Sequence, residues 1–568
     1  MRIKFVVFYL LISSFFSFCG AQSLKSLSKV QKAVVSVNTY DKNGDLLKSG
    51  TAFYIGPDGD AVADYSLFKN AYRAIVVDMN GKQYDVDCIN GADDTYSVIR
   101  FKVIVKNNAY MNIAAAGTDN GSTVYFVPFS REKMKQCADA IVESSDSIQS
   151  KYLYYTLSSC LDSLGVGCPV LNAKGDVTAI MQPSVDGKGY ALDIRFKDEL
   201  KIKAISSSSA NIALTNVYIP KGIPDTVEEA LVYAYFKSRS SNNDEYLDVM
   251  NRFVASYPNN ADGYIRRCVP LIDLRRFDEA DSDMQRYLSL STDKANAYFN
   301  ISQTVYNKLV YMPTPEYPKW SFDYAIDYAD KSSAIYQSSA DTAKWCEALV
   351  LKAKILTDYK KFDESVAIYD FMLHLNEKNK APLLYAKSLV CEKRGDNDSS
   401  LIVIMDSAVS CFPSPLPRDA ANYVLRRGQL YSRVGKSRKA VSDYNEYCYL
   451  VNNQVSDVFY YDRSQIEMEA RFYQQAYDDI SKAIEMAPKN IDYKAEKAAM
   501  CLRFGYVDET VSLCEEVLAV VPDDVTCLRI LGYSLLQKGD KEKARAILNK
   551  AVDLGDSTSK EIMDKYLK

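Results

Sequence analysis

A strict spacing of 34 residues near the C-terminal end constrains the fold of this chain more than any other feature of its sequence. Residues recur at this interval in three columns: Ala476, Thr510 and Ala544; Ile480, Cys514 and Leu548; and Ala483, Val517 and Ala551. Two prolines, Pro488 and Pro522, close successive units at the same interval. A period of about 20–50 residues is typical of architectures that repeat and stack one supersecondary unit. The sequence therefore predicts a repeat array, in which each unit buries its apolar face against its neighbours.

This spacing resembles that of the tetratricopeptide repeat (TPR) family. In that family a pair of helices forms each unit, and small residues occupy positions 8, 20 and 27, where the two helices cross closely. The last unit matches best, through Leu528, Leu531, Gly532, Leu535, Ala544, Leu548 and Ala551. Weaker matches extend back to residue 227, with an insertion at residues 311–321. The resemblance implies an all-α TPR solenoid of about nine helix pairs over residues 227–556, with a generic antiparallel helical array as the alternative.

The polar residues 557–568 are expected to form a C-terminal capping helix, because a stack of repeats needs a solvated end. The resemblance also implies a concave groove lined by the first helix of each pair, with positions 2, 5, 9, 12 and 13 facing it. In the last four units the predicted groove residues are Gln429, Arg433, Tyr461, Gln465, Arg503, Arg529 and Tyr533. Aromatic and arginine side chains are frequent anchors of protein partners, so a protein or peptide ligand is predicted. The alternative for each of these residues is a solvated surface position. The Lys and Asn of the carboxylate clamp known in chaperone-binding members are absent, which argues against binding of chaperone tails.

The first third of the chain has a different pattern, in which short runs alternate apolar and polar residues. Residues 33–41 (AVVSVNTYD), 50–56 (GTAFYIG) and 74–79 (AIVVDM) are examples, and residues 56–60 (GPDGD) have the composition of a hairpin turn. Many short strands separated by turns favour an all-β barrel or sandwich. The sequence predicts a β domain over residues 24–203, large enough for two small barrels, and a linker over residues 204–226.

Four segments of this domain resemble, in the same order, the landmarks of trypsin-like serine proteases of the HtrA type. Residues 34–68 resemble the opening strands and the Thr-Asn-x-His turn, and residues 81–103 resemble the stretch that carries the catalytic aspartate. Residues 165–180 resemble the Gly-Asn-Ser-Gly-Gly-Pro segment, and residues 187–194 resemble the strand beside the specificity pocket. The resemblance implies a multidomain chain, with an all-β trypsin-like double barrel followed by the all-α TPR solenoid.

The resemblance places the histidine, aspartate and serine of the family at Ser66, Thr95 and Val166. Asp93 and Asp94 lie close to Thr95 and leave a shift of register open at that position. The Ser-His-Asp mechanism needs an imidazole that accepts the proton of the serine hydroxyl, and valine has no hydroxyl. The three positions are therefore predicted to be non-catalytic.

The chain contains one histidine, His374, which lies within the predicted repeats and is expected to be a surface or packing residue. The sequence thus predicts a pseudoprotease, with no enzymatic activity. The alternative is an active trypsin-like peptidase with a non-classical site, in which Cys168 or Ser163 is the nucleophile and a lysine or carboxylate replaces the histidine.

The 13 cysteines do not form a metal-binding pattern, because there is no CxxC motif and no Cys/His cluster. Neither a metal nor another cofactor is predicted. Cys268 and Cys501 fall at small positions of the repeats, where a free thiol behaves as a small apolar group. One disulfide among Cys137, Cys160 and Cys168 is left open.

Residues 1–21 have the composition of a secretory signal peptide. Arg2 and Lys4 precede an apolar run at residues 5–18, and small residues follow before residue 22. The run is shorter than the roughly 20 residues of a transmembrane helix, and no later segment is apolar enough to span a membrane. Export to the periplasm of a Gram-negative bacterium is predicted, with lipid anchoring at Cys19 as the alternative, although Phe18 does not fit the lipoprotein motif.

The net charge of −4 and the lack of a dense Lys/Arg run argue against a nucleic-acid ligand, which usually requires a basic patch. The predicted function is an exported scaffold or adaptor that binds a protein partner. The sequence does not constrain the oligomeric state.

Overall fold

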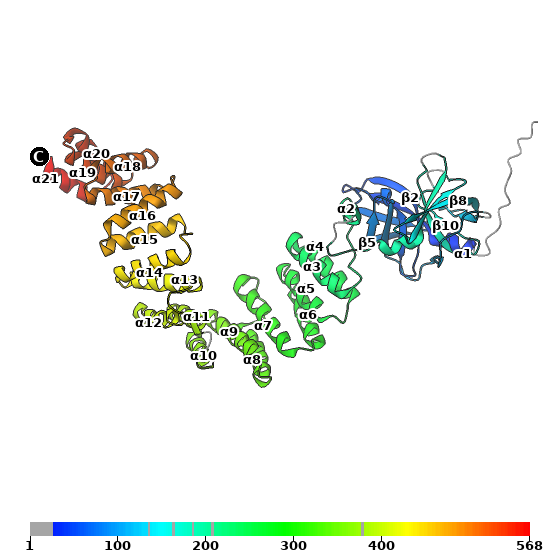
Figure 1. The fold of residues 1–568 in the computed structure, drawn as a ribbon, viewed down its shortest axis with the longest axis horizontal. Coiled ribbons are helices and arrows are strands. Elements are labelled where there is room, and N and C mark those ends of the chain that lie inside the picture. The colour runs from blue at the N-terminus through cyan, green and yellow to red at the C-terminus, as the bar shows by residue number, and fades with distance from the viewer. Residues whose placement is uncertain are drawn as a thin grey trace, which may run out of the picture. The chain divides into compact units, whose positions relative to one another are not determined.

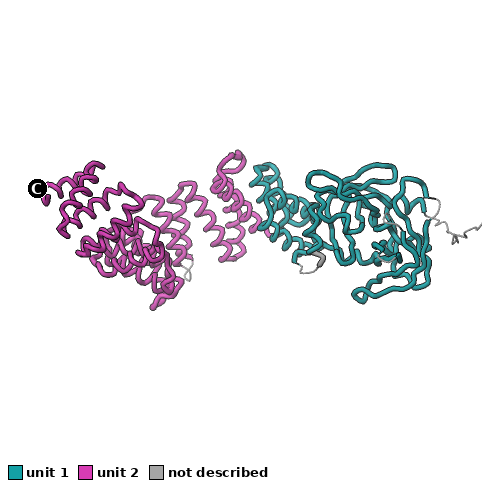
Figure 2. The backbone as a smooth tube through the Cα atoms, turned by 90° about the horizontal axis from the view of Figure 1, so that it is seen from above, with its two compact units in different colours: residues 1–292 teal, residues 293–568 magenta. Residues whose placement is uncertain are grey.

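The computed structural model describes residues 27–134, 137–161, 165–184, 187–205, 209–375 and 380–567. The chain divides into two compact units, Met1–Thr292 and Asp293–Lys568, which Figure 2 shows in teal and magenta. The described part of the first unit contains twelve β-strands and the first helices, whereas that of the second consists of helices and their connections. The predicted signal segment, residues 1–21, lies outside the described residues.

The strands of the first unit form two closed antiparallel barrels of six strands each (Figure 1). The first barrel has the order β1-β2-β3-β6-β5-β4, and the second has the order β7-β8-β9-β12-β11-β10, which is the same topology repeated. The strands of the first barrel are β1 (Val34–Tyr40), β2 (Leu46–Tyr54), β3 (Asp60–Asp64), β4 (Arg73–Val77), β5 (Gln83–Asp93) and β6 (Val98–Val103). Those of the second are β7 (Thr123–Phe126), β8 (Ala138–Ile148), β9 (Tyr152–Leu157), β10 (Pro169–Leu171), β11 (Val177–Gln182) and β12 (Gly189–Asp193). The predicted double barrel is confirmed.

Strand β1 shows why the sequence alternates as it does. Val35 and Val37 point into the first barrel, where they share a core with Phe101. Val34, on the other face of the strand, joins a second core that also contains Leu171 and Ile180 of the second barrel. Because successive side chains of a strand point to opposite faces, one strand contributes both to the interior of its own barrel and to the contact between the barrels.

The segment over residues 204–226 packs against the first barrel. It contains helix α2 (Ser209–Thr215), and the Tyr65 hydroxyl donates a hydrogen bond to the Ala213 carbonyl at 3.0 Å. Farther along, the Ile89 N–H donates to the Pro220 carbonyl and the Gly222 N–H donates to the Ile89 carbonyl, both at 2.8 Å. The predicted linker therefore extends the hydrogen bonding of strand β5; its residues 206–208 lie outside the described residues.

Helices follow in consecutive pairs, as the green-to-red part of Figure 1 shows. The first unit contains α3 (Val227–Ser240), α4 (Asn243–Ser256), α5 (Ala261–Asp273) and α6 (Phe277–Leu290). The second unit contains α7 (Lys294–Tyr311), α8 (Phe322–Ser338), α9 (Thr342–Asp358), α10 (Phe362–Leu375), α11 (Lys380–Arg394), α12 (Asp398–Val409), α13 (Ala421–Arg433), α14 (Ser437–Leu450), α15 (Asp457–Ala470), α16 (Tyr473–Met486), α17 (Ile491–Phe504), α18 (Val507–Val520), α19 (Val525–Gln537), α20 (Lys541–Asp553) and α21 (Ser557–Tyr566). A β double barrel followed by an α solenoid is the predicted fold class.

Small residues lie where the two helices of a pair approach closely. A Cβ atom added to Gly532 in α19 would lie 2.6 Å from Cγ of Leu548 in α20. In the pair α7/α8 the Ser302 hydroxyl donates to the Ala325 carbonyl at 2.7 Å. Larger side chains at these points would push the helices apart, which explains the small-residue columns of the repeat.

A buried ion pair recurs in the array and was not recognised in the sequence. An arginine of the first helix binds an aspartate 16 residues later in the second helix through two hydrogen bonds. The pairs are Arg267–Asp283, Arg427–Asp443 and Arg463–Asp479. The same three arginines also bond to the preceding helix pair, through Asn251, Asp406 and Asn445. Each pair therefore links two neighbouring repeats as well as the helices of one repeat.

No helix in the described part of the chain is long and apolar enough to cross a membrane. Cys137, Cys160 and Cys168, among which one disulfide was left open, are all free thiols.

Candidate functional site

The three positions that the sequence resemblance assigns to a protease triad lie on three turns, and the turn with Ser66 adjoins the other two. Ser66 is in the short 3-10 turn Tyr65–Leu67 after β3, and Thr95 is exposed in the turn between β5 and β6. The Tyr65 N–H donates to the Ser97 carbonyl at 3.1 Å, which joins these two turns. The half-buried Val166 belongs to a third turn, which precedes β10. The structure therefore brings together the segments that the sequence had placed at one site.

Gly167 allows the turn that contains Val166 to lie close to the first barrel. This glycine has a φ of +78°, and a Cβ atom on it would lie 2.7 Å from the Thr51 carbonyl oxygen and 3.3 Å from the Asp64 nitrogen. The Asp64 side chain is 1% exposed, and its Oδ1 atom accepts a hydrogen bond from the Ser66 N–H at 2.9 Å. Its Oδ2 atom has no partner among the described residues. The close approach of two backbones here requires a residue without a side chain.

Cys168, the candidate replacement nucleophile, is fully buried in the core of the second barrel. Burial raises the pKa of its thiol to about 12, because the thiolate would lose its hydration. A neutral, inaccessible thiol is a poor nucleophile. The other candidate, Ser163, lies outside the described residues.

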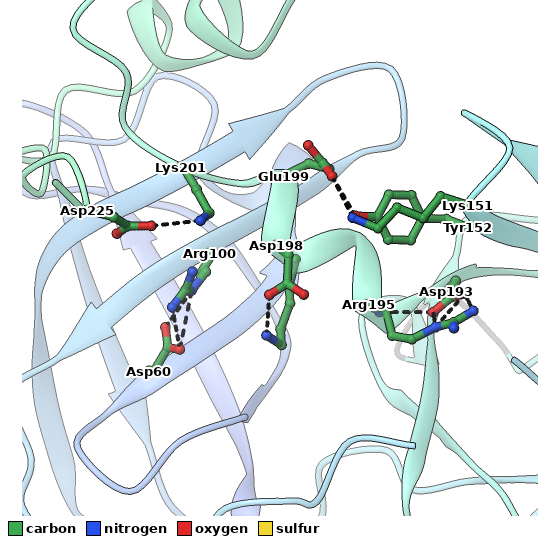
Figure 3. A network of polar contacts seen from close by, with 11 residues as sticks. Asp60, Arg100, Lys151, Tyr152, Asp193, Arg195, Asp198, Glu199, Lys201 and Asp225 are labelled. Atoms are coloured by element: carbon green, nitrogen blue, oxygen red, sulfur yellow. Dashed lines mark hydrogen bonds and ion pairs between the residues drawn. The ribbon is translucent and has the colours of Figure 1, made fainter. Parts of the chain in front are cut away.

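A network of polar contacts surrounds the segment that leaves the second barrel (Figure 3). The buried Asp193 carboxylate accepts hydrogen bonds from Nε of Arg195 at 3.0 Å and from Nη2 of the same residue at 2.5 Å. Glu199 accepts from the Tyr152 hydroxyl at 2.5 Å and from Nζ of Lys151 at 3.3 Å, and the bond from Tyr152 lowers the pKa of Glu199. Two ion pairs lie in the same region, Arg100–Asp60 and Lys201–Asp225. These charged groups pair with one another, so the network fixes the position of the segment that leaves the second barrel.

A cavity in the second unit lies on the first helices of three consecutive pairs. It has a volume of about 660 Å³ and is lined by α7, α9 and α11, with one residue from α10. Counted from the buried Ser302 at position 8, its α7 residues Phe299, Gln303, Tyr306 and Asn307 occupy positions 5, 9, 12 and 13. These are the positions that face the groove in the family that the repeat resembles. We call this cavity the α7–α11 groove.

The α7–α11 groove combines aromatic surface with polar side chains. Tyr311 at its edge is 81% exposed. The Tyr306 hydroxyl donates to Oδ2 of Asp358 at 2.6 Å, and burial together with this carboxylate raises the pKa of Tyr306. Gln303 and Lys354 are exposed in the lining. Amphipathic rings beside amide and charged groups are typical of surfaces that bind a polypeptide segment.

The groove residues predicted from the sequence lie on α13, α15, α17 and α19. Gln429 and Arg503 are exposed, as a groove position requires. Arg433 is bound to Glu392 and Asp398 at 2.7 and 3.0 Å. These three positions are not part of the α7–α11 groove.

Three of the other four predicted groove residues contact neighbours within the array. Tyr461 stacks on Tyr493, with ring centroids 4.9 Å apart, and Nε2 of Gln465 is buried without a partner among the described residues. The C-terminal segment contacts the remaining two: Arg529 binds Asp556, the N-cap residue of α21, at 2.8 Å, and the ring of Tyr533 lies 6.0 Å from that of Tyr566 in α21.

The α7–α11 groove was not predicted from the sequence, because the predicted groove residues lie in the four C-terminal units, including those with the strictest spacing. The insertion at residues 311–321 breaks the period after α7, yet the position count within α7 still identifies Phe299 and Gln303. His374 is exposed at the end of α10, with its Nδ1 atom 2.6 Å from the Asp370 carbonyl oxygen, as expected for a surface residue.

Comparison with known proteins supports the repeat. The chain is 26% identical over 206 residues to the TPR repeat-containing protein MJ1428 of Methanocaldococcus jannaschii, an alignment that covers 35% of this chain and 34% of that protein. No protein-family model matches the chain. The described residues thus form a helical repeat region, similar to a TPR-containing protein, that follows two β-barrels.

Proposed function

We propose that this protein is a binding scaffold, whose helical array holds a segment of a partner protein in the α7–α11 groove. The observation that carries the proposal is the cavity of about 660 Å³ on the concave helices, lined by residues at the groove positions of the repeat. Stacked helix pairs offer an extended surface of this kind for protein ligands. The similarity to a TPR repeat-containing protein supports the same class of function.

We further propose that the double barrel is a trypsin-like domain without catalytic activity. Ser66, Thr95 and Val166 occupy the three segments that meet between the barrels, and none carries the imidazole or the activated hydroxyl that acyl transfer needs. The burial of Cys168 argues against a cysteine nucleophile at this point. In this proposal the barrels serve as a rigid support for the first helices.

The protein is proposed to act after export, in the periplasm of a Gram-negative bacterium. The support is the composition of residues 1–21, in which a short apolar run follows two basic residues.

The binding proposal is tested by affinity capture from an envelope extract with the protein from residue 22 onward. Gln303→Ala combined with Lys354→Ala removes two exposed side chains of the groove. The control, Gln337→Ala combined with Lys360→Ala, removes the same residue types at exposed positions outside the groove lining. We expect a captured protein to be retained by the control and lost from the groove variant. Equal capture by both variants would show that the groove is not the binding site.

The catalytic question is tested with the same preparations by hydrolysis of casein. No turnover is expected from folded protein. Hydrolysis that is lost in Cys168→Ala would instead identify an active peptidase with a rebuilt site.

A further inference from the structure

A second cavity lies at the turns that join the helices of two neighbouring pairs, α13/α14 and α15/α16. Its volume is about 490 Å³, and the lining includes four basic side chains: Lys436, Arg438, Lys439 and Arg471. We call this cavity the basic pocket. It is formed by other elements than the α7–α11 groove, so an inference about it does not depend on the proposed function.

The four basic side chains make no ion pair among the described residues, although most of their neighbours do. The arginines of the adjoining helices α13 and α15 all have carboxylate partners: Arg426, Arg427, Arg433 and Arg463. The single carboxylate in the lining of the pocket, Glu469, accepts a hydrogen bond from the Ser437 hydroxyl at 3.0 Å. Within the described residues, the basic pocket therefore gathers four basic side chains without an ion pair around one carboxylate, that of Glu469.

Aromatic rings help to hold two of these cations. The Arg438 guanidinium lies 5.9 Å from the ring centroid of Phe472, and Nζ of Lys439 lies 5.4 Å from that of Tyr431. Such contacts are favourable but leave the charge of the cation in place. Four like charges around one cavity repel one another, and an anionic ligand would relieve this repulsion.

We propose that the basic pocket binds an acidic peptide segment of a partner protein, in which neighbouring Asp or Glu carboxylates pair with Arg438 and Arg471. Guanidinium groups bind carboxylates with two parallel hydrogen bonds, and the two lysines add charge without a fixed geometry. Four cations spread over two helix pairs exceed what one phosphate group contacts. A nucleic acid would need a longer basic track to follow its backbone, and the pocket is a single local cluster.

The test uses the protein from residue 22 onward and a fluorescein-labelled peptide of eight alternating Asp and Glu residues, and binding is followed by fluorescence anisotropy. Saturable binding that weakens steeply with added salt is expected, because the contact is made by exposed charges. Arg438→Gln combined with Arg471→Gln should weaken binding about tenfold or more. Both side chains are exposed, and circular dichroism verifies that the variant keeps the helical fold.

A matched control separates the pocket from the general charge of the protein. Lys541→Gln combined with Lys560→Gln removes two exposed positive charges elsewhere in the same unit and should leave peptide affinity unchanged. Equal losses in the two variants would overturn the proposal, because they would show unspecific attraction.

Two further probes distinguish other sources of negative charge. Pyrophosphate and vesicles that contain anionic lipid should each compete poorly with the peptide. Binding of either probe without binding of the peptide would overturn the assignment to an acidic segment. The groove variant Gln303→Ala/Lys354→Ala should bind the peptide like the unchanged protein, so failure of the proposed function and failure of this inference give different results.

Discussion

The two barrels are held by contacts between residues far apart in the chain, whereas the helical array is held by contacts that repeat over short distances. The hydrogen bond from Tyr65 to Ala213 joins residues 148 positions apart, and that from Gln31 to Glu132 joins residues 101 positions apart. In the array the buried pair of Arg463 and Asp479 spans 16 positions, as its two counterparts do.

This difference in the range of the contacts affects how the stability of each region responds to a substitution. A stack of repeats depends on contacts between neighbours, so damage to one repeat remains largely local. The barrels share a core between them, to which Val34 of the first and Leu171 of the second contribute, so damage at their contact is expected to affect both. Hydrogen exchange with mass spectrometry during urea unfolding reports on each region separately, so substitutions in the two regions can be compared directly.

The largest effect is expected in the array, from Arg463→Ala. The guanidinium binds Asp479 through two hydrogen bonds, and the two side chains are 12% and 10% exposed. Removal of the arginine leaves a buried carboxylate without its partner, which costs about 4 kcal/mol in the free energy of unfolding. Peptides of α15 and α16 should lose protection, whereas those of the barrels should keep it.

Lys543→Ala is the control for this variant. Its ion pair with Asp540 is 3.3 Å long and the lysine side chain is 76% exposed, so solvent and salt screen the contact. No measurable loss of stability is expected. A similar loss in both variants would mean that burial does not determine the strength of these pairs.

A smaller effect is expected at the contact between the barrels, from Gly167→Ala. This position combines a φ of +78° with the Thr51 carbonyl oxygen at 2.7 Å from any Cβ atom, and a backbone atom cannot move aside as a side chain can. We expect a loss of about 3 kcal/mol, from strain together with overpacking. Protection should fall in both barrels, because the turn joins them.

Gly505→Ala, a substitution in the array, separates backbone strain from overpacking. Gly505 has a φ of +84°, but nothing lies within 4 Å of a Cβ atom built on it. The Gly505→Ala variant should therefore lose only about 1 kcal/mol in the free energy of unfolding, through backbone strain alone. Equal losses for the two glycines would show that the close approach of the barrels adds nothing to the cost.

The same contrast between the array and the barrels explains which features of the fold could be predicted from the sequence. The columns through Ala476, Ile480 and Ala483 identify buried residues of the array directly, because the same environment recurs at a fixed interval. In the barrels each environment occurs once. The sequence landmarks predicted the order of the segments and placed Ser66 and Val166 at one site. They did not predict the packing of Gly167 against Thr51, which depends on two distant segments.

The candidate binding surfaces were harder to predict than the fold. Arg529 and Tyr533 occupy groove positions by their spacing, yet contacts with α21 engage them, and spacing within one repeat carries no information about the helix that follows the stack. The α7–α11 groove and the basic pocket arise where several repeats leave space between side chains. Such space depends on the sizes of all the neighbours, so no local pattern marks it.

A dependence on pH is expected in the array, through Glu467 on α15. This carboxyl is 2% exposed, and burial together with the nearby Asp479 raises its pKa to about 8. Arg463, 3.8 Å away, opposes this shift, but its guanidinium is already bound to Asp479. The folded protein therefore keeps a proton on Glu467 at neutral pH, whereas the unfolded chain has released it.

The sign of the effect follows from this difference in bound protons. The pKa in the folded state is raised, so the contribution of Glu467 is fully present below the unfolded pKa of about 4.3 and is lost as pH rises toward about 8. Between pH 6 and pH 8 the loss amounts to about 2 kcal/mol. Glu467→Gln keeps a neutral side chain at every pH, so its array should become more stable than that of the unchanged protein by this amount over the same interval. Glu485→Gln, an exposed change on α16, should give no such gain. If the unfolding free energies of unchanged protein and Glu467→Gln run parallel from pH 6 to pH 8, the carboxyl is ionised in the folded array and Arg463 serves both of its acidic neighbours.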